Sequence, residues 1–176
     1  GIDDLAVDLV WLVTRKPDQI LREGADTNPF HIAVFIPAWD EGEVIAAMIR
    51  STLSRWQGDR QVTLYIGVYP NDAATRDAAL ALQSEQVRVV VTHAPGPTTK
   101  ADCLNALWRH FAQEKGAFDP TRHAIVLHDA EDVVHRLELA LYRLHLAECA
   151  MIQIPVMPLA DPRSPWIAVH YIDEFS

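Results

Sequence analysis

Clustered acidic side chains in the stretch HDAEDVVH, residues 128–135, are the strongest sign of chemistry in this sequence. Asp129, Glu131 and Asp132 follow the apolar run AIVLH (124–128), which predicts a buried strand. Carboxylates this close repel one another unless a cation neutralises them, and a few hard oxygen ligands suit Mg²⁺ or Mn²⁺. The alternative is ordinary helix capping, since acids in the first turn of a helix are favoured by the macrodipole. The stretch alone leaves both interpretations open.

Two histidines frame these acids, but their spacing is not that of a zinc site. His128 and His135 are seven positions apart, and no HExxH pattern is present. We therefore expect both histidines to be packing or helix-surface residues.

The stretch IPAWDE (36–41) follows another apolar run and also carries polar groups. Trp39 offers a flat face on which a base could stack. Asp40 is a good helix N-cap, with Glu43 three residues later as in a capping box. Capping is the simpler interpretation of this stretch when it is taken alone.

Two further stretches place polar side chains after apolar runs. YPND (69–72) ends in Asp72, again a capable N-cap. HAPGPTTKAD (93–102) brings two threonines and Lys100 to a predicted helix start, where free N–H groups and an ammonium could hold a phosphate. The loop lacks the GxxxxGK[ST] and GxGxxG patterns, which weakens a P-loop or a dinucleotide-binding interpretation.

Alternating apolar runs and amphipathic segments must position these groups. Strands are predicted at 31–37, 62–68, 87–91, 124–128 and 151–156, and helices at 3–22, 40–56, 72–83, 100–114 and 130–148. Strands that are apolar on both faces and separated by helices predict an α/β fold with a mostly parallel sheet covered on both sides. In such sheets ligands bind beyond the carboxyl ends of the strands, where all four polar stretches are expected.

Composition limits the class of protein. The 176 residues carry a formal net charge of −9, which argues against nucleic-acid binding by a basic surface. Their 49% hydrophobic content predicts one globular domain with a core. Cys103 and Cys149 are expected to be reduced core thiols, and no run is long enough for a membrane span. Because the chain opens on Gly1, we expect a fragment of a longer protein.

Several of these motifs together resemble the family 2 glycosyltransferases of the GT-A fold. The stretches are IPAWDE, YPND, PGPTTKADCLN, LHDAEDVV, MIQIPV and HYIDEF, in this order. They are most similar to the inner-membrane, bacteriophage adsorption protein B-type group, and the resemblance covers nearly the whole chain. It implies a Rossmann-like nucleotide-sugar-binding domain at 29–176, preceded by a juxtamembrane-like helix and linker at 1–28. It also implies a parent protein at the cytoplasmic face of the bacterial inner membrane, attached through segments missing from this chain, with the fragment itself soluble.

The resemblance also implies roles for individual residues. Asp129 and Glu131 would match the family's DxD pair, which holds Mg²⁺ or Mn²⁺ against the phosphates of a nucleotide-diphosphate sugar, expected to be a UDP-sugar. Glu in place of the second Asp is a departure, and Asp132 could take part instead. The donor itself would be bound by Pro37, Ala38, Trp39, Asp40, Asp72, Lys100 and Asp129. Transfer to a saccharide or lipid-linked acceptor is expected to be inverting.

The family's general base is not found in this sequence. It lies in an ED-type motif downstream of the strand that IQIPV resembles, and so is expected beyond Ser176. Asp173 and Glu174 are carboxylates but do not match its placement. We therefore expect the 176-residue chain to bind donor weakly and to be catalytically inactive.

Two other functions are compatible with the same residues. A non-catalytic interaction module would use the acids only as caps and solvated surface. A metal-dependent nucleotidyltransferase would also hold a nucleotide through carboxylates and a cation.

Overall fold

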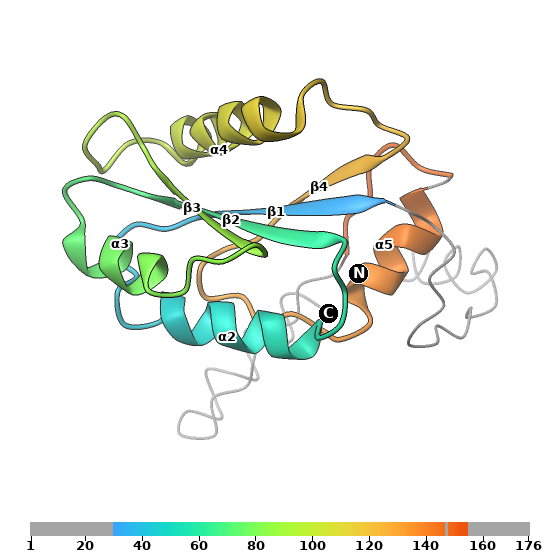
Figure 1. Ribbon diagram of the computed structural model, residues 1–176, viewed down its shortest axis with the longest axis horizontal. Helices are drawn as coiled ribbons and strands as arrows, with labels where there is room; N and C mark the ends of the chain where they lie inside the picture. The colour runs from blue at the N-terminus through green and yellow to red at the C-terminus, as the bar shows by residue number, and fades with distance from the viewer. Residues whose placement is uncertain (1–29, 147, 155–176) are drawn as a thin grey trace, which may run out of the picture. The chain divides into compact units, whose positions relative to one another are not determined.

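A four-stranded parallel sheet organises the residues that the computed structural model describes, 30–146 and 148–154 (Figure 1). Its strands are β1 (His31–Pro37), β2 (Val62–Val68), β3 (Val87–Val91) and β4 (His123–Leu127), in the order β3-β2-β1-β4. The helices between them are α2 (Ile45–Arg55), α3 (Ala73–Leu80) and α4 (Lys100–Lys115), and α5 (Glu138–Leu146) follows β4. The prediction of an α/β fold with a parallel sheet is confirmed.

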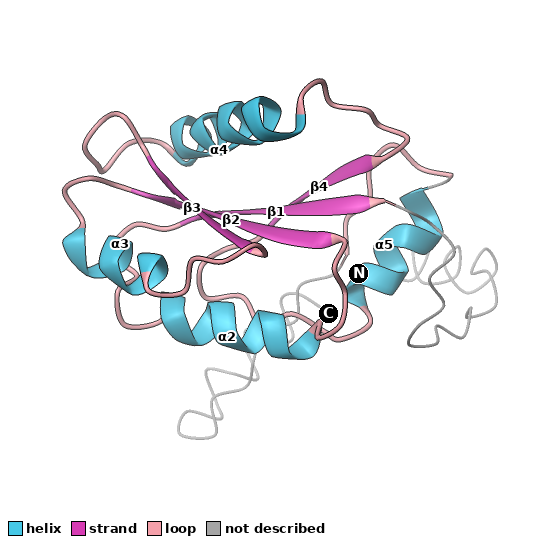
Figure 2. Cartoon of the chain, in the orientation of Figure 1, coloured by secondary structure: helices cyan, strands magenta, loops and turns pink. Residues whose placement is uncertain are grey.

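The direction in which strands are added reverses after β3. The chain runs outward from β1 through β2 to β3, with α2 and α3 on one face of the sheet (Figure 2). It then returns to place β4 on the other side of β1, and the connecting α4 covers the opposite face. Right-handed crossovers require this change of face when the direction reverses. The reversal lies between β1 and β4, and ligands of such sheets bind where the loops after two such strands diverge.

The two central strands are the most buried part of the sheet. All of β2 and the five inner residues of β1 are buried, whereas β3 and β4 are partly exposed. On the α4 face Phe35, Tyr65 and Phe111 form edge-to-face pairs with ring centroids 5.6–6.1 Å apart. Such pairs each contribute about 0.5–1.5 kcal/mol beyond area burial. A Cβ added to Gly67 would lie 2.4 Å from Cys103 Sγ, so only glycine lets α4 pack this closely on β2.

Two predicted helices begin later in the structure than expected. α2 begins at Ile45 instead of residue 40, and its N-cap is Val44, without a side-chain cap. The predicted capping box of Asp40 and Glu43 is therefore wrong. α5 begins at Glu138 instead of residue 130, so the acids at 129–132 are not in its first turn. Simple capping of a helix does not explain these acids.

The other two helices agree closely with the sequence. Asp72 is the N-cap of α3, as predicted. α4 begins at Lys100 as expected, behind a capping box of Thr99 and Asp102 that the sequence reading missed. The predicted fifth strand is wrong over 151–154, which have no regular secondary structure. Cys103 is buried as predicted, but Cys149 is exposed, so the prediction of a second core thiol is wrong.

The described residues belong to two compact units. The first, which ends at Arg143, contains the sheet, α2, α3, α4 and residues 138–143 of α5, and the second begins at Leu144. The predicted helix at 3–22, the linker before residue 29, residues 155–156 and both Asp173 and Glu174 lie outside the described residues. No helix in the described part of the chain is long and apolar enough to cross a bilayer.

Candidate functional site

The loop after β1 is hydrogen-bonded to the start of α3. Asp40 has a φ of 60°, and its backbone N–H donates to Asp72 Oδ2 at 2.7 Å. The next N–H, that of Glu41, donates to Thr75 Oγ1 at 2.8 Å. Left-handed backbone is uncommon outside glycine and persists where surrounding contacts hold it. These two bonds therefore set the direction in which the chain leaves β1.

Asp72 acts as an anchor for two segments of the chain. Its other oxygen, Oδ1, accepts the Thr75 N–H at 3.2 Å and so caps α3. Burial raises the pKa of Asp72, but the hydrogen bonds from Thr75 and Asp40 outweigh burial and hold that pKa below its ordinary value. Asp72 thus supports the rim, by which we mean the loops beyond the carboxyl ends of the strands, where Asp40 lies. The predicted contact of Asp72 with a nucleotide stays a prediction.

Trp39 lies just beyond the end of β1, with 36% of its surface exposed. Its ring is edge-to-face with Tyr69, at a centroid distance of 5.2 Å. Gly96 packs directly on the indole, because an added Cβ would lie 2.4 Å from Trp39 Cζ3. The Asn71 amide holds Gly96 in place by two hydrogen bonds of 2.7 Å, one to its N–H and one to its carbonyl. The 93–99 loop therefore covers part of the indole, and a base can stack only on the part that stays exposed.

Pro37 and Ala38 belong to the sheet more than to the rim. Pro37 pairs with Gly67 of β2, and the Ala38 N–H donates to the Gly67 carbonyl at 2.8 Å. Ala38 is 1% exposed. These residues can form the floor beneath a ligand, while Trp39 and Asp40 present exposed side chains.

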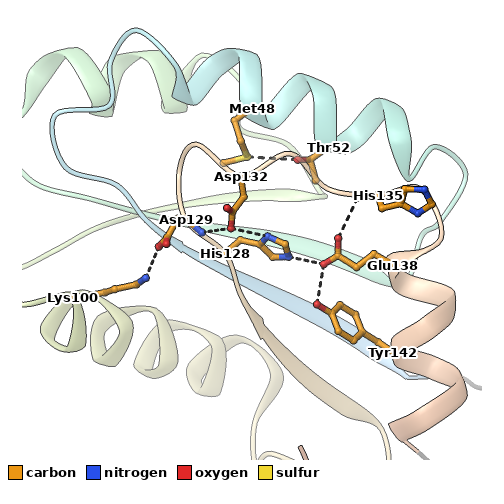
Figure 3. Close-up of polar contacts among 9 residues, drawn as sticks. All are labelled: Met48, Thr52, Lys100, His128, Asp129, Asp132, His135, Glu138 and Tyr142. Atoms are coloured by element: carbon orange, nitrogen blue, oxygen red, sulfur yellow. Dashed lines mark hydrogen bonds and ion pairs between the residues drawn. The ribbon is translucent and has the colours of Figure 1, made fainter. Parts of the chain in front are cut away.

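Lys100 and Asp129 form an ion pair between the start of α4 and the loop after β4 (Figure 3). The pair joins Lys100 Nζ to Asp129 Oδ1, and the two side chains are 55% and 51% exposed. A residue of the β3–β4 crossover and a residue that follows β4 thus meet in solvent. A cationic group already lies on the carboxylate that the sequence singled out as a metal ligand.

The N-terminus of α4 is capped by the chain itself. The Thr99 hydroxyl accepts the Asp102 N–H at 3.2 Å and donates to Asp102 Oδ2 at 2.8 Å. The Thr98 hydroxyl lies 2.9 Å from the hydroxyl of Tyr69. Because the Asp102 carboxylate and both hydroxyls are engaged at this end, Lys100 is the group of this loop most available to a phosphate.

The three acids after β4 face different surroundings. Asp129 and Glu131 are exposed, whereas Asp132 is turned towards the protein. Asp132 Oδ2 accepts the Asp129 N–H at 2.8 Å and lies 3.2 Å from His128 Nδ1. Burial, together with the charge of Glu131 and then those of Asp40 and Asp72, raises the pKa of Glu41. Glu131 therefore shares an acidic rim with the loop after β1.

A metal cage built by the protein alone is absent from the described part of the chain. No group of three or more His, Cys, Asp or Glu side chains there is arranged to hold a metal ion. Mg²⁺ and similar cations are commonly held by one or two carboxylates, with water and substrate phosphates completing the shell. The exposed carboxylates of Asp129 and Glu131 suit such a cation. In this structure the positive charge next to Asp129 is supplied by the Lys100 ammonium.

A largely buried polar network joins the acid loop, residues 128–135, to Glu138 and Tyr142 of α5 (Figure 3). The carboxylate of Glu138, a residue 5% exposed, lies 2.7 Å from His128 Nε2 and accepts the Tyr142 hydroxyl at 2.9 Å. His128 thus has a carboxylate at each ring nitrogen. Burial lowers the pKa of His128, but the Glu138 and Asp132 carboxylates outweigh it and raise that pKa above its ordinary value. His128 lies part-buried between two carboxylates and outside any helix, which corrects its prediction as a packing or helix-surface residue.

Trp56 of the segment after α2 contacts His135 at the C-terminal end of the acid loop. Trp56 Nε1 donates to the His135 carbonyl at 3.1 Å, and the Trp56 ring is edge-to-face with His128. The His135 ring is exposed, and its Nδ1 accepts the Leu137 N–H at 3.2 Å. Sequence reasoning missed Glu138 and Tyr142; the one available signal was a Glu within the apolar run LELALY (137–142).

Comparison with known proteins gives the family. The model of the family described as "Glycosyltransferase like family 2" matches residues 29–176. Two Escherichia coli relatives, "Bacteriophage adsorption protein B" of strain K12 and "Bacteriophage N4 adsorption protein B" of O157:H7, are each 33% identical over 188 residues. That alignment covers 100% of this chain and 25% of each relative, so the chain spans about a quarter of their length. No solved structure shows a significant match.

The parallel sheet, its helices on both faces and the strand order fit a Rossmann-like domain of the GT-A type. The family model covers most of the chain, including all four polar stretches at the strand ends. The chain belongs to the glycosyltransferase-like family 2.

Proposed function

We propose that this chain binds the diphosphate of a nucleotide sugar together with a divalent cation, beyond the carboxyl ends of β1 and β4. The observation that carries the proposal is the meeting of Lys100 and Asp129, an ammonium and a carboxylate delivered by different loops to that edge. The family match supports a nucleotide sugar as the class of ligand. The α/β topology supports the location, since ligands of such sheets bind where the strand order reverses.

The chain's own residues would divide the work. The Lys100 ammonium donates to phosphate oxygens once it leaves Asp129, because a charge-assisted bond to phosphate replaces the ion pair. Asp129 and Glu131 would hold Mg²⁺ or Mn²⁺, which supplies positive charge that stabilises a departing nucleoside diphosphate. Trp39 and Asp40 present an exposed ring and a carboxylate to the base and ribose.

Between the two candidate second ligands, the contacts favour Glu131. Asp132 Oδ2 already has two partners, the Asp129 N–H and His128 Nδ1. Turning Asp132 outward would break both of these contacts. Glu131 is exposed and needs no such rearrangement.

Sugar transfer is proposed for the whole protein, because the relatives of this chain are about four times as long as the chain itself. The donor proposed is a UDP-sugar, and the acceptor is a saccharide or a lipid-linked saccharide. Attachment of the parent protein to the bacterial inner membrane belongs to the same proposal.

Calorimetric titration of UDP and UDP-sugars, with and without Mn²⁺, tests the binding proposal. Wild-type chain is expected to bind in a Mn²⁺-dependent way, and Asp129→Asn is expected to weaken that binding by at least about 10-fold, since one ligand charge is lost. Asp77→Asn is the matched control, because Asp77 is an exposed carboxylate on α3 that pairs with Arg76. No binding by the wild type would reject the proposal in favour of an interaction module. Equal loss in both variants would reject the assignment of Asp129.

A further inference from the structure

We propose that Glu138 is a positioning residue for the acid loop and that it acts on Asp129 through His128 and Asp132. The inference rests on the proposed function, because it concerns the same binding edge. Glu138 lies in the first turn of α5 and is not one of the exposed acids.

The first link is the buried Glu138 carboxylate. One oxygen lies 2.7 Å from His128 Nε2 and accepts the Tyr142 hydroxyl at 2.9 Å, and the other accepts the His135 N–H at 3.4 Å. A buried carboxylate is costly unless it is paired and hydrogen-bonded. These three donors satisfy that requirement and tie α5 to both ends of the 128–135 loop.

The second link runs from His128 to the candidate ligand. The opposite ring nitrogen, His128 Nδ1, lies 3.2 Å from Asp132 Oδ2. The same Asp132 oxygen accepts the Asp129 N–H at 2.8 Å. Glu138 therefore orients His128, His128 fixes Asp132, and Asp132 fixes the backbone from which the Asp129 carboxylate projects.

The composition of this network favours positioning over stability. Buried ion pairs contribute little net stability, since desolvation offsets their attraction, and apolar side chains of similar volume often do as well. Here two carboxylates and an imidazole lie next to the backbone of the exposed Asp129. Directional hydrogen bonds hold a ligand's backbone in one place, and partners of this kind tune ligands in metal sites generally.

The experiment compares Glu138→Gln with Tyr142→Phe in the full 176-residue chain. Gln has the shape of Glu but lacks its charge, whereas Phe removes one hydrogen bond to Glu138 and leaves the His128 contact intact. Three quantities are measured: the thermal midpoint, the Asp129 amide resonance without ligand, and the affinity for UDP in the presence of Mn²⁺. Asp132→Ala, a partly exposed position, breaks the same path at its other end and should move the same resonance.

We expect Glu138→Gln to move the Asp129 amide resonance and to weaken UDP binding by about 10-fold, with Tyr142→Phe near wild type in both. The two variants should have similar thermal midpoints. An unmoved Asp129 resonance, or wild-type affinity in Glu138→Gln, would overturn the positioning role while leaving the proposed function intact. If wild type binds no UDP with Mn²⁺, the proposed function fails, and the positioning role fails with it.

Discussion

Replacing Lys100 with methionine should change the affinities for Mn²⁺ and for UDP in opposite directions. In the structure the Lys100 ammonium pairs with Asp129, the carboxylate proposed to hold the cation. A free cation must displace this ammonium before it can bind. A diphosphate, in contrast, gains a charged donor when Lys100 turns to it. One side chain therefore opposes the metal alone and favours the nucleotide.

The exposure of the pair sets the size of the first effect. With side chains 55% and 51% exposed, this is a solvated ion pair, worth at most about 1 kcal/mol. Its removal should therefore raise the affinity for Mn²⁺ alone by no more than about 5-fold. Loss of a charge-assisted bond to phosphate costs about 1.5–3 kcal/mol, so the affinity for UDP with Mn²⁺ should fall by about 10- to 150-fold.

Electron paramagnetic resonance of free Mn²⁺ measures the first affinity, and calorimetry with UDP at saturating Mn²⁺ measures the second. Lys115→Met is the matched control, because Lys115 ends α4 and pairs with Glu114 instead of Asp129. It should leave both affinities unchanged. If Lys100→Met lowers both affinities, or alters neither, Lys100 does not exchange between Asp129 and a phosphate and the reasoning is wrong.

Two further predictions concern the rim and the opposite end of the sheet. Gly96→Ala should lower the free energy of unfolding by about 1–3 kcal/mol, because the new methyl group overlaps the Trp39 ring. Chemical denaturation measures this free energy, and an unchanged value would contradict the packing of Gly96 on Trp39. Burial, then the charges of Lys115 and His123, lowers the pKa of His31 from 6.5 to about 4. Between these values only the unfolded chain takes up the proton, so His31 should cost stability as pH falls from 6.5 towards 4. His31→Phe should remove that part of the pH dependence, and equal slopes for both proteins in urea denaturation would refute it.

The strands could be predicted from sequence because burial on both faces leaves a simple signal. The ranges expected for β1, β2 and β3 agree with the structure, since each is an apolar run that ends at a turn. The carboxyl edge of the sheet, and with it the region of the candidate site, follows from this alternation alone. Asp72 as a helix cap was predictable for the same reason, because capping depends on residues close in the sequence.

The starts of α2 and α5 were mispredicted because acids near them make tertiary contacts. Asp40 has the residue type of an N-cap, yet its backbone is held by Asp72, 32 positions away. A local rule cannot include such a partner. The turn that results separates Asp40 from the helix and leaves its carboxylate exposed beside Trp39.

The same limit applies to the acids after β4, where residue type cannot distinguish a ligand from a support. Asp129, Glu131 and Asp132 are equivalent as oxygen donors, and the DxD-like spacing permits more than one pair. What separates them is the His128 side chain, which contacts Asp132 on one side and Glu138 on the other. The sequence shows Glu138 only as a charge within an apolar helix, and such charges are buried only when paired. An unexplained charge on the buried face of a helix, a few residues beyond an acid cluster, is therefore the feature from which a supporting network of this kind could be predicted.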